Sequence, residues 1–185
     1  MIKNIRLLII LSSFLFLSNS CKKSKNTDVE IILPILFVDR MPEEQEGVDS
    51  LIERITLEFP TSLEDALVKN NTKKENIKSA RLTNLRLQVI EHTFLDSTKY
   101  SNWKELSEIQ LDIISSNVGR EKVAFKMIPD VRTKAINMEI IDVELKRYLQ
   151  QDKFAMAIRY RKRRPMYNDL EYIISGSFKI VAKAI

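Results

Sequence analysis

The sequence predicts an all-β protein with minor helical content: a two-layer antiparallel β-sandwich of about seven to eight strands with one or two short helices. Three observations predict this fold. Apolar and polar residues alternate over short runs in the second two-thirds of the chain, turn-forming residues separate these runs, and apolar repeats with a helical period are few. Seven such runs favour two packed sheets over a closed barrel.

The first segment of the chain has the composition of a secretory signal. Lys3 and Arg6 precede the apolar run 7–17, and polar residues then lead to Cys21, the single cysteine. This segment resembles the signal of bacterial lipoproteins, in which a signal peptidase of the second type cleaves before a cysteine that carries a diacylglycerol thioether. Ser18 stands where the strict lipobox has Leu. The alternative interpretation is an ordinary secretory signal that leaves Cys21 as a free thiol.

The resemblance implies a signal peptide over residues 1–20 and acyl chains, palmitate among them, on Cys21. These chains would attach the protein to a membrane of the bacterial cell envelope. Lys22 follows the cysteine, where lipoproteins kept at the inner membrane usually have Asp, so the resemblance favours the outer membrane and leaves the periplasmic or surface face open. Residues 21–30 are polar and basic, which predicts a flexible tether after the lipidated cysteine.

Residues 31–49 are expected to form a docked apolar segment and an acidic linker. The run 31–38 is too apolar to stay in water, and it is too short and too interrupted by proline to cross a membrane. The linker 39–49 contains a proline, a glycine and several acids. The β-sandwich domain is then expected over residues 50–185.

Strands are expected where apolar residues recur at every second position. These runs are 55–59, 85–89, 109–113, 123–127, 136–140, 154–160 and 172–182, the last with a bend at Gly176. Gly119 can take a positive φ in a short loop, which predicts a hairpin from 108 to 127. Two short helices are predicted, one after Ser62 as N-cap and one over 143–149 as a one-turn crossover.

The composition excludes several kinds of site. One Cys, one His and three Gly cannot build a disulfide framework, a multi-His metal centre or a glycine-rich phosphate loop within one chain. We therefore expect no metal and no cofactor. We interpret His92, which has Glu91 beside it, as a surface or structural histidine, because no nucleophile motif accompanies it. No catalytic residue is predicted, and we expect a protein that is not an enzyme.

A carbohydrate-binding module or carbohydrate-active enzyme at the cell surface is the alternative function. Six carboxylates could converge as acids do in glycosidases, or they could simply line solvated strand faces. They are Glu105, Glu108, Asp112, Glu139, Asp142 and Glu144. Trp103, close to Tyr100, could stack on a sugar, but a single Trp before an apolar strand is more often part of the core, and we favour that interpretation.

The segment 159–164 holds five cations in six residues. The candidate residues for binding an anion or a partner are Arg159, Arg161, Lys162, Arg163 and Arg164. Strand alternation places the first two on the face opposite the apolar residues, and the other three are expected in the loop before Pro165. Three interpretations remain open: binding of an anionic lipid or glycan, docking to an acidic partner in an envelope protein complex, or an edge strand protected by charge. We do not expect nucleic acid as a partner.

Two tripeptides around Ser50 and Ser97 resemble the acid–hydroxyl pattern of a general O-glycosylation system of periplasmic and surface proteins. The resemblance implies that both serines lie on exposed loops. Together, the signal, the tether and the absence of a catalytic motif predict a membrane-anchored envelope lipoprotein with a non-catalytic binding or scaffolding role.

Overall fold

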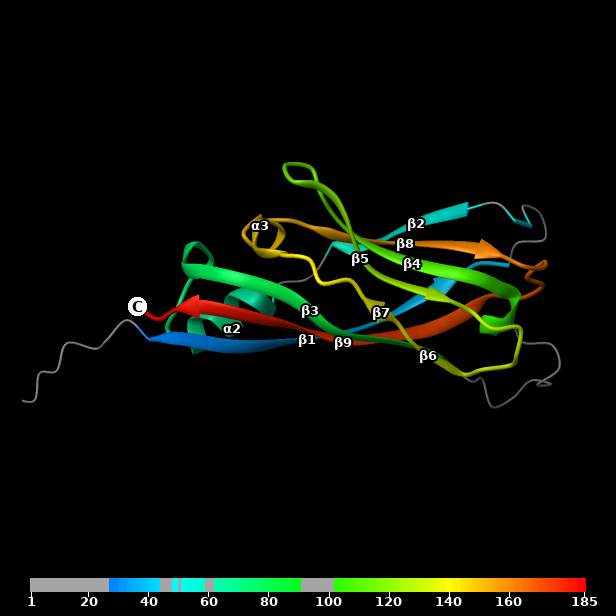
Figure 1. Ribbon diagram of the computed structural model, residues 1–185, viewed down its shortest axis with the longest axis horizontal. Coiled ribbons are helices and arrows are strands. Elements are labelled where there is room, and N and C mark those ends of the chain that lie inside the picture. The colour runs from blue at the N-terminus through cyan, green and yellow to red at the C-terminus, as the bar shows by residue number, and fades with distance from the viewer. Residues whose placement is uncertain (1–26, 44–47, 50, 59–61, 91–101) are drawn as a thin grey trace, which may run out of the picture.

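The computed structural model describes residues 27–43, 48–49, 51–58, 62–90 and 102–185. Within this range the chain forms two antiparallel sheets packed against each other, with two short α-helices towards one end (Figure 1). This arrangement confirms the predicted β-sandwich.

The first sheet has four strands and the second has five. The first sheet has the order β1 (Asp28–Met41), β9 (Leu170–Lys183), β3 (Ile77–Val89) and β6 (Ala135–Asn137). The second has the order β2 (Leu51–Glu58), β8 (Ala155–Lys162), β4 (Leu106–Ser115), β5 (Gly119–Met127) and β7 (Glu139–Ile140). Every strand pair is antiparallel, as the alternating sequence pattern predicts.

The segment predicted to dock on the core is strand β1. It pairs with β9 along its whole length, from Asp28 opposite Lys183 to Met41 opposite Leu170. The sandwich therefore includes residues 28–41, which the sequence pattern placed before a domain beginning at residue 50. The amide of Ala184 donates to the carbonyl oxygen of Thr27 (3.2 Å), so the start of β1 and the C-terminus lie at the same end of the molecule.

The core lies between the sheets and is built by alternation along each strand. In β4, Ile109, Leu111 and Ile113 are buried, and in β9 so are Ile174 and Phe178. Burial of these side chains is the main favourable contribution to folding. In the described part of the chain, the outward positions are polar on β3 and mixed on β8 and β9, as predicted for strands with one polar or mixed face.

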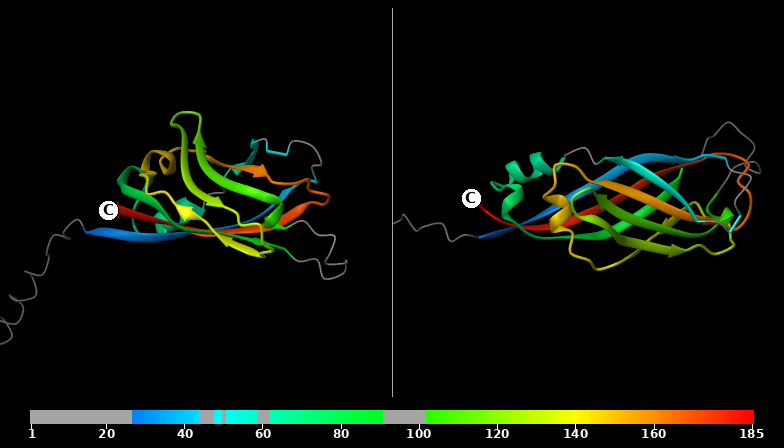
Figure 2. Two further views of the ribbon diagram at one scale, coloured as in Figure 1. Left: turned by 45° about the vertical axis from the view of Figure 1, so that its right-hand side comes forward. Right: turned by 90° about the horizontal axis from the view of Figure 1, so that it is seen from above.

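The two predicted helices are present. Helix α2 (Ser62–Lys69) buries Leu63 and Leu67, and helix α3 (Lys146–Leu149) is a single turn between β7 and β8 that buries Tyr148 and Leu149. Two short 3₁₀ turns, η1 (Lys74–Asn76) and η2 (Trp103–Glu105), precede β3 and β4. Helix α2 packs against β1 and helix α3 against β3 and β4, and both lie towards one end of the sandwich (Figure 2).

The predicted hairpin is formed by β4 and β5. Gly119 has a φ of 101° at the start of β5, a conformation that glycine adopts without strain. A bulge between Leu111 and Asp112 bends the pair. The tip of the hairpin rises away from the first sheet (Figure 2).

The predicted strand 136–140 is divided between the two sheets. Ile136 pairs with Leu87 in the first sheet, and Ile140 pairs with Ala124 in the second. Between them the amide of Met138 donates to the carbonyl oxygen of Leu85 (2.9 Å). The chain therefore crosses from one layer to the other at Met138.

Candidate functional site

Strand β8 carries the first arginines of the predicted anion-binding segment. Met156, Ile158 and Tyr160 are buried, and Arg159 and Arg161 alternate with them on the outer face of the second sheet, as predicted. However, β8 lies between β2 and β4 and pairs with both. The interpretation of this segment as an edge strand protected by charge is therefore wrong.

Arg159 contacts a fully buried carboxylate. Its Nη2 lies 2.8 Å from Oδ2 of Asp112, whose side chain is 0% exposed although it stands on the outer face of the sheet. Gln110 donates from Nε2 to the other carboxylate oxygen of Asp112 (2.6 Å). Asp112 Oδ2 and Arg159 Nε each lack a well-directed hydrogen bond among the described residues, so the ion pair depends mainly on charge attraction.

Arg120 joins this cluster from the hairpin. Its Nη1 and Nη2 donate to the two carboxylate oxygens of Glu53 at 2.6 Å each, and its Nε lies 3.7 Å from Asp112 Oδ2. Glu53 and Arg120 are on β2 and β5, which are three strand spacings, or about 14 Å, apart in a flat sheet. The two side chains therefore reach across β8 and β4 and cover Asp112. We call Glu53, Asp112, Arg120 and Arg159 the charged network.

The charged network shifts the pKa of two of its members. The hydrogen bond from Arg120 lowers the pKa of Glu53, against a smaller effect of burial. The hydrogen bond to Glu53 raises the pKa of Arg120 in turn. Both groups are therefore held in their charged forms at neutral pH.

Arg161 has partners on both sides of β8, one on β4 and one just before β2. Its Nε lies 3.5 Å from Glu108 Oε1, and its guanidinium donates to the carbonyl oxygen of Asp49. Lys162, predicted in the following loop, is the last residue of β8 and is fully buried, because the alternation continues to one more inward position, two residues beyond Tyr160. Its side chain does not reach the surface that an anion would contact.

Arg163 and Arg164 lie at the end of the sandwich. Arg163 donates to the carbonyl oxygens of Lys104 (3.0 Å) and Ile128 (2.6 Å), which ties the segment after β8 to η2 and to the end of β5. Arg164 donates to the carboxylate of Asp130. On this side of the molecule, five guanidinium groups thus meet the carboxylates of Glu53, Glu108, Asp112 and Asp130.

The other carboxylates considered for catalysis have separate structural partners. Glu105 accepts from the amide of Asn102 (2.5 Å) and completes a capping box at η2. Glu139 lies 2.8 Å from Lys126, and Asp142 pairs with Arg81. Glu144 accepts from the amides of Ala80 (2.8 Å) and Lys146 (2.9 Å). Each of these acids stabilises a different part of the fold.

Trp103 belongs to the core, which is the interpretation that the sequence analysis favoured. It is 0% exposed, its Nε1 donates to the carbonyl oxygen of Lys134 (3.3 Å), and its ring meets that of Tyr172 edge to face at 5.4 Å between centroids. A buried Trp cannot stack on a sugar at the surface.

Tyr172 and Asp39 form a polar pair that the sequence pattern did not indicate. The Tyr172 hydroxyl donates to Asp39 Oδ2 (2.9 Å). Burial raises the pKa of Tyr172 well above its ordinary value, and the nearby Asp39 carboxylate raises it further. The sequence feature that could have indicated this pair is the spacing of Asp39, which continues the inward series of Ile31, Leu33 and Ile35 along β1.

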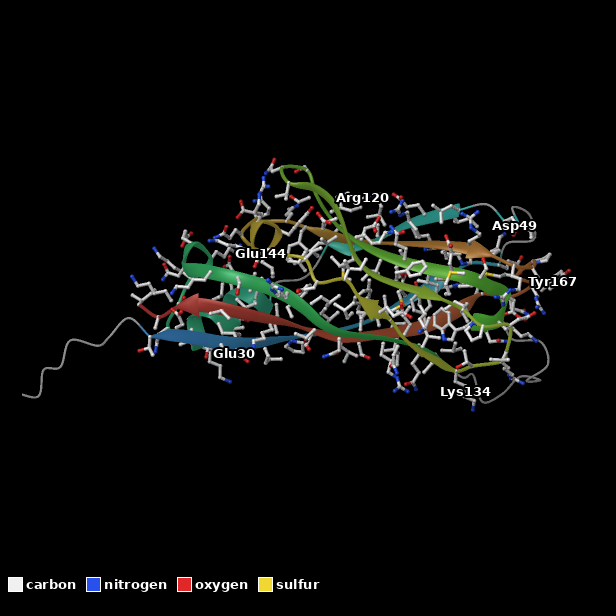
Figure 3. All side chains as sticks on the ribbon, in the orientation of Figure 1. Glu30, Asp49, Arg120, Lys134, Glu144 and Tyr167 are labelled. Carbon is white, nitrogen blue, oxygen red and sulfur yellow. The ribbon has the colours of Figure 1, made fainter. Side chains whose placement is uncertain are left out.

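The outer face of the first sheet differs from that of the second. Ile32, Leu36 and Val38 on β1 are 56%, 74% and 60% exposed, and the exposed Pro34 stands between them. Figure 3 shows Glu30 of β1 and Arg120 of β5 on opposite outer sides of the sandwich. An open hollow of about 620 Å³ lies beside the middle of β1, β9 and β3. Its lining includes Pro34, Leu36, Asn84, Arg86, Asn137 and Ser175.

Six residues named in the sequence analysis lie outside the described residues: Cys21, Ser50, Glu91, His92, Ser97 and Tyr100. In the described part of the chain, no group of three or more His, Cys, Asp or Glu side chains is arranged to hold a metal ion. No helix in that part is long and apolar enough to span a membrane. Comparison with protein-family models and with curated proteins finds no match to this chain.

Proposed function

We propose that the protein is a lipid-anchored lipoprotein of the bacterial cell envelope with a non-catalytic binding or scaffolding role. The observation that carries this proposal is the position of Cys21. It ends a signal-like segment and stands only seven residues before Asp28, where β1 begins. An acyl chain on Cys21 would hold the sandwich within about 25 Å of a membrane. Because Lys22 follows Cys21, we assign the anchor to the outer membrane.

The outer face of the second sheet at the end of β8, together with Arg164 just after the strand, is the candidate surface for an anionic partner. Among the five cations of the segment 159–164, Arg161 and Arg164 have the most exposed side chains, at 39% and 41%. Their carboxylate partners, Glu108 and Asp130, are themselves partly exposed, so these ion pairs contribute little to stability. An acidic glycan or protein could replace those carboxylates without disturbing the buried pair of Arg159 and Asp112.

Mass spectrometry of the protein purified from detergent-solubilised membranes tests the anchor. The expected N-terminal peptide begins at Cys21 and carries two or three acyl chains. An unmodified Cys21 in a soluble protein contradicts the proposal. Cys21→Ala serves as the control, and this variant should leave the membrane fraction.

Chromatography on immobilised heparin, an acidic polysaccharide, tests the anionic partner. The double variant Arg161→Gln, Arg164→Gln is expected to elute at lower salt than the unchanged protein. Lys69→Gln, Lys73→Gln, which removes the same charge from the helical end of the sandwich, is the matched control. Equal elution of both variants contradicts a site on the second sheet.

We do not propose the carbohydrate-active alternative. In that alternative the side chain of Trp103 stacks on a sugar, but its indole ring is buried in the core.

A further inference from the structure

We propose that the outer face of the first sheet lies against the bilayer that holds the anchor. In this orientation the exposed apolar residues of β1 enter the headgroup region, and cations on β3 meet anionic phospholipids. The inference rests on the proposed lipid anchor, because the anchor brings this face to the membrane.

The first argument is the apolar row on β1. Ile32, Pro34, Leu36 and Val38 occupy successive outward positions, so their side chains lie next to one another on one face. Scattered exposed apolar residues are ordinary, but a continuous row marks a surface that binds another apolar phase. On β9, the half-buried Ile173 stands opposite Val38 and widens the row.

The second argument is the charge of the same face. On β1, β9 and β3, six cations and three acids occupy outward positions. The cations are Arg40, Lys78, Arg81, Arg86, Lys179 and Lys183, and the acids are Asp28, Glu30 and Glu171. Arg86 forms no ion pair with any described residue and lines the hollow beside Leu36. Four of the other cations form ion pairs: Lys78 with Asp28, Lys179 with Glu30, and Arg40 and Arg81 with Asp169 and Asp142, which lie outside these strands. The excess positive charge beside the apolar row is therefore concentrated at Arg86, where an anionic phospholipid headgroup would supply the counter-charge.

The third argument is the path of the chain. The seven residues from Cys21 to Asp28 span at most about 25 Å, so the start of β1 stays near the acyl chains. Strand β1 then continues for 14 residues, or about 46 Å, along the length of the molecule. The anchor therefore gives the bilayer a high effective concentration at this strand, whereas a soluble partner has to reach it by diffusion.

The opposite face is not suited to lipid. There the charged network places carboxylates of Glu53 and Asp112 among its arginines. Ile55 is exposed beside it on β2, but its neighbours on that strand's outer face include the charged Glu53. The sandwich would therefore face the membrane with the first sheet and present the second sheet to a partner.

A single fluorescent label tests this orientation. Cys21 is the only cysteine and is acylated in the proposed protein, so Leu36→Cys introduces one free thiol for an environment-sensitive nitrobenzoxadiazole label. Ile55→Cys and Val68→Cys are matched controls, since their side chains are 68% and 73% exposed, close to the 74% of Leu36. The acylated proteins are reconstituted in vesicles of phosphatidylethanolamine and phosphatidylglycerol that contain a nitroxide-labelled lipid.

The expected result is several-fold stronger quenching, with a blue-shifted emission, at Leu36 than at Ile55 or Val68. Equal quenching at all three positions, or stronger quenching at Ile55, overturns the inference. Arg86→Gln should weaken quenching at Leu36 in these vesicles, whereas Lys126→Gln on the second sheet should not. An equal effect of both variants contradicts the role of charge on this face.

Mass spectrometry of the same preparations separates the two proposals. Acyl chains on Cys21 without preferential quenching at Leu36 overturn only the orientation. A Cys21 without acyl chains overturns the lipid anchor and the orientation that depends on it.

Discussion

Gly176 of β9 stands directly against the backbone of β3 at Asn84. A Cβ atom on Gly176 would lie 2.4 Å from the carbonyl oxygen of Asn84 and 3.1 Å from Cδ1 of Leu85. A bulge in β3 between Leu82 and Asn84 brings the two strands into this contact. Pairing of β9 with β1 continues through Gly176 without a change of register. The glycine therefore provides room for the bulge of the neighbouring strand.

Replacing Gly176 by Ala should lower the free energy of unfolding by about 1–3 kcal/mol, because the methyl group must displace backbone rather than a flexible side chain. Urea denaturation measures the change. Ser175→Ala, at the adjacent outward position, is the control and should change stability by less than about 0.5 kcal/mol. Equal losses in both variants would contradict the close approach to Asn84.

Asp112→Ala should destabilise the protein by about 2–4 kcal/mol, because Arg159 and Arg120 would lose the buried carboxylate that compensates their charge. Glu139→Ala is a matched control: its ion pair with Lys126 has the same 2.8 Å separation as that of Arg159 and Asp112, but it is exposed. That variant should lose less than about 1 kcal/mol. Chemical denaturation of both variants measures the two losses in free energy of unfolding. Equal losses would contradict a larger contribution from the buried pair.

Arg120→Gln should return the pKa of Glu53 towards its ordinary value, since the hydrogen bond from Arg120 is the main cause of the lowered pKa. A carboxyl group with a lowered pKa in the folded state stabilises the protein above its unfolded pKa. That contribution disappears as the pH falls through the folded pKa. The stability difference between the parent protein and Arg120→Gln should therefore be largest at neutral pH and shrink in acid. NMR titration of the Glu53 carboxyl group, with denaturation at several pH values, tests this.

Tyr172→Phe should cost about 1 kcal/mol at neutral pH through loss of the hydrogen bond to Asp39. The raised pKa of Tyr172 also predicts an alkaline effect. A raised folded pKa gives stability that is complete below the unfolded pKa of about 10 and is lost as the pH rises towards the folded pKa. The parent protein should therefore lose more stability than Tyr172→Phe above that pH. Parallel loss in denaturation experiments on the two proteins would argue against a buried, protonated Tyr172.

The strands that alternate cleanly were predictable, and the departures have physical causes. Strand β3 was predicted only over 85–89, because the bulge before Leu85 shifts the inward phase of Ala80 and Leu82 by one residue. Strand β1 was not predicted as a strand because its outward positions are apolar too, which removes the contrast on which the period of two depends.

The contacts of the cationic segment were less predictable than its alternation. Sequence alone does not show that β8 is central or that Glu53 and Arg120 reach over it to enclose Asp112. Lysine is usually a surface residue, yet the position of Lys162 two residues beyond the inward-facing Tyr160 directs its side chain into the core. Which charges remain available to a partner therefore depends on strand order, and strand order depends on contacts between residues far apart in the sequence.

The pairing of β1 with β9 has a mechanical consequence. A force that pulls the chain at Asp28 along the axis of β1, against a hold at the far end of the sandwich, loads all 14 residue pairs of the two strands together. The same force applied between Asp28 and Lys183, which face each other at one end, would separate the pairs one after another. The domain should therefore resist shear along β1 far better than it resists peeling from that end.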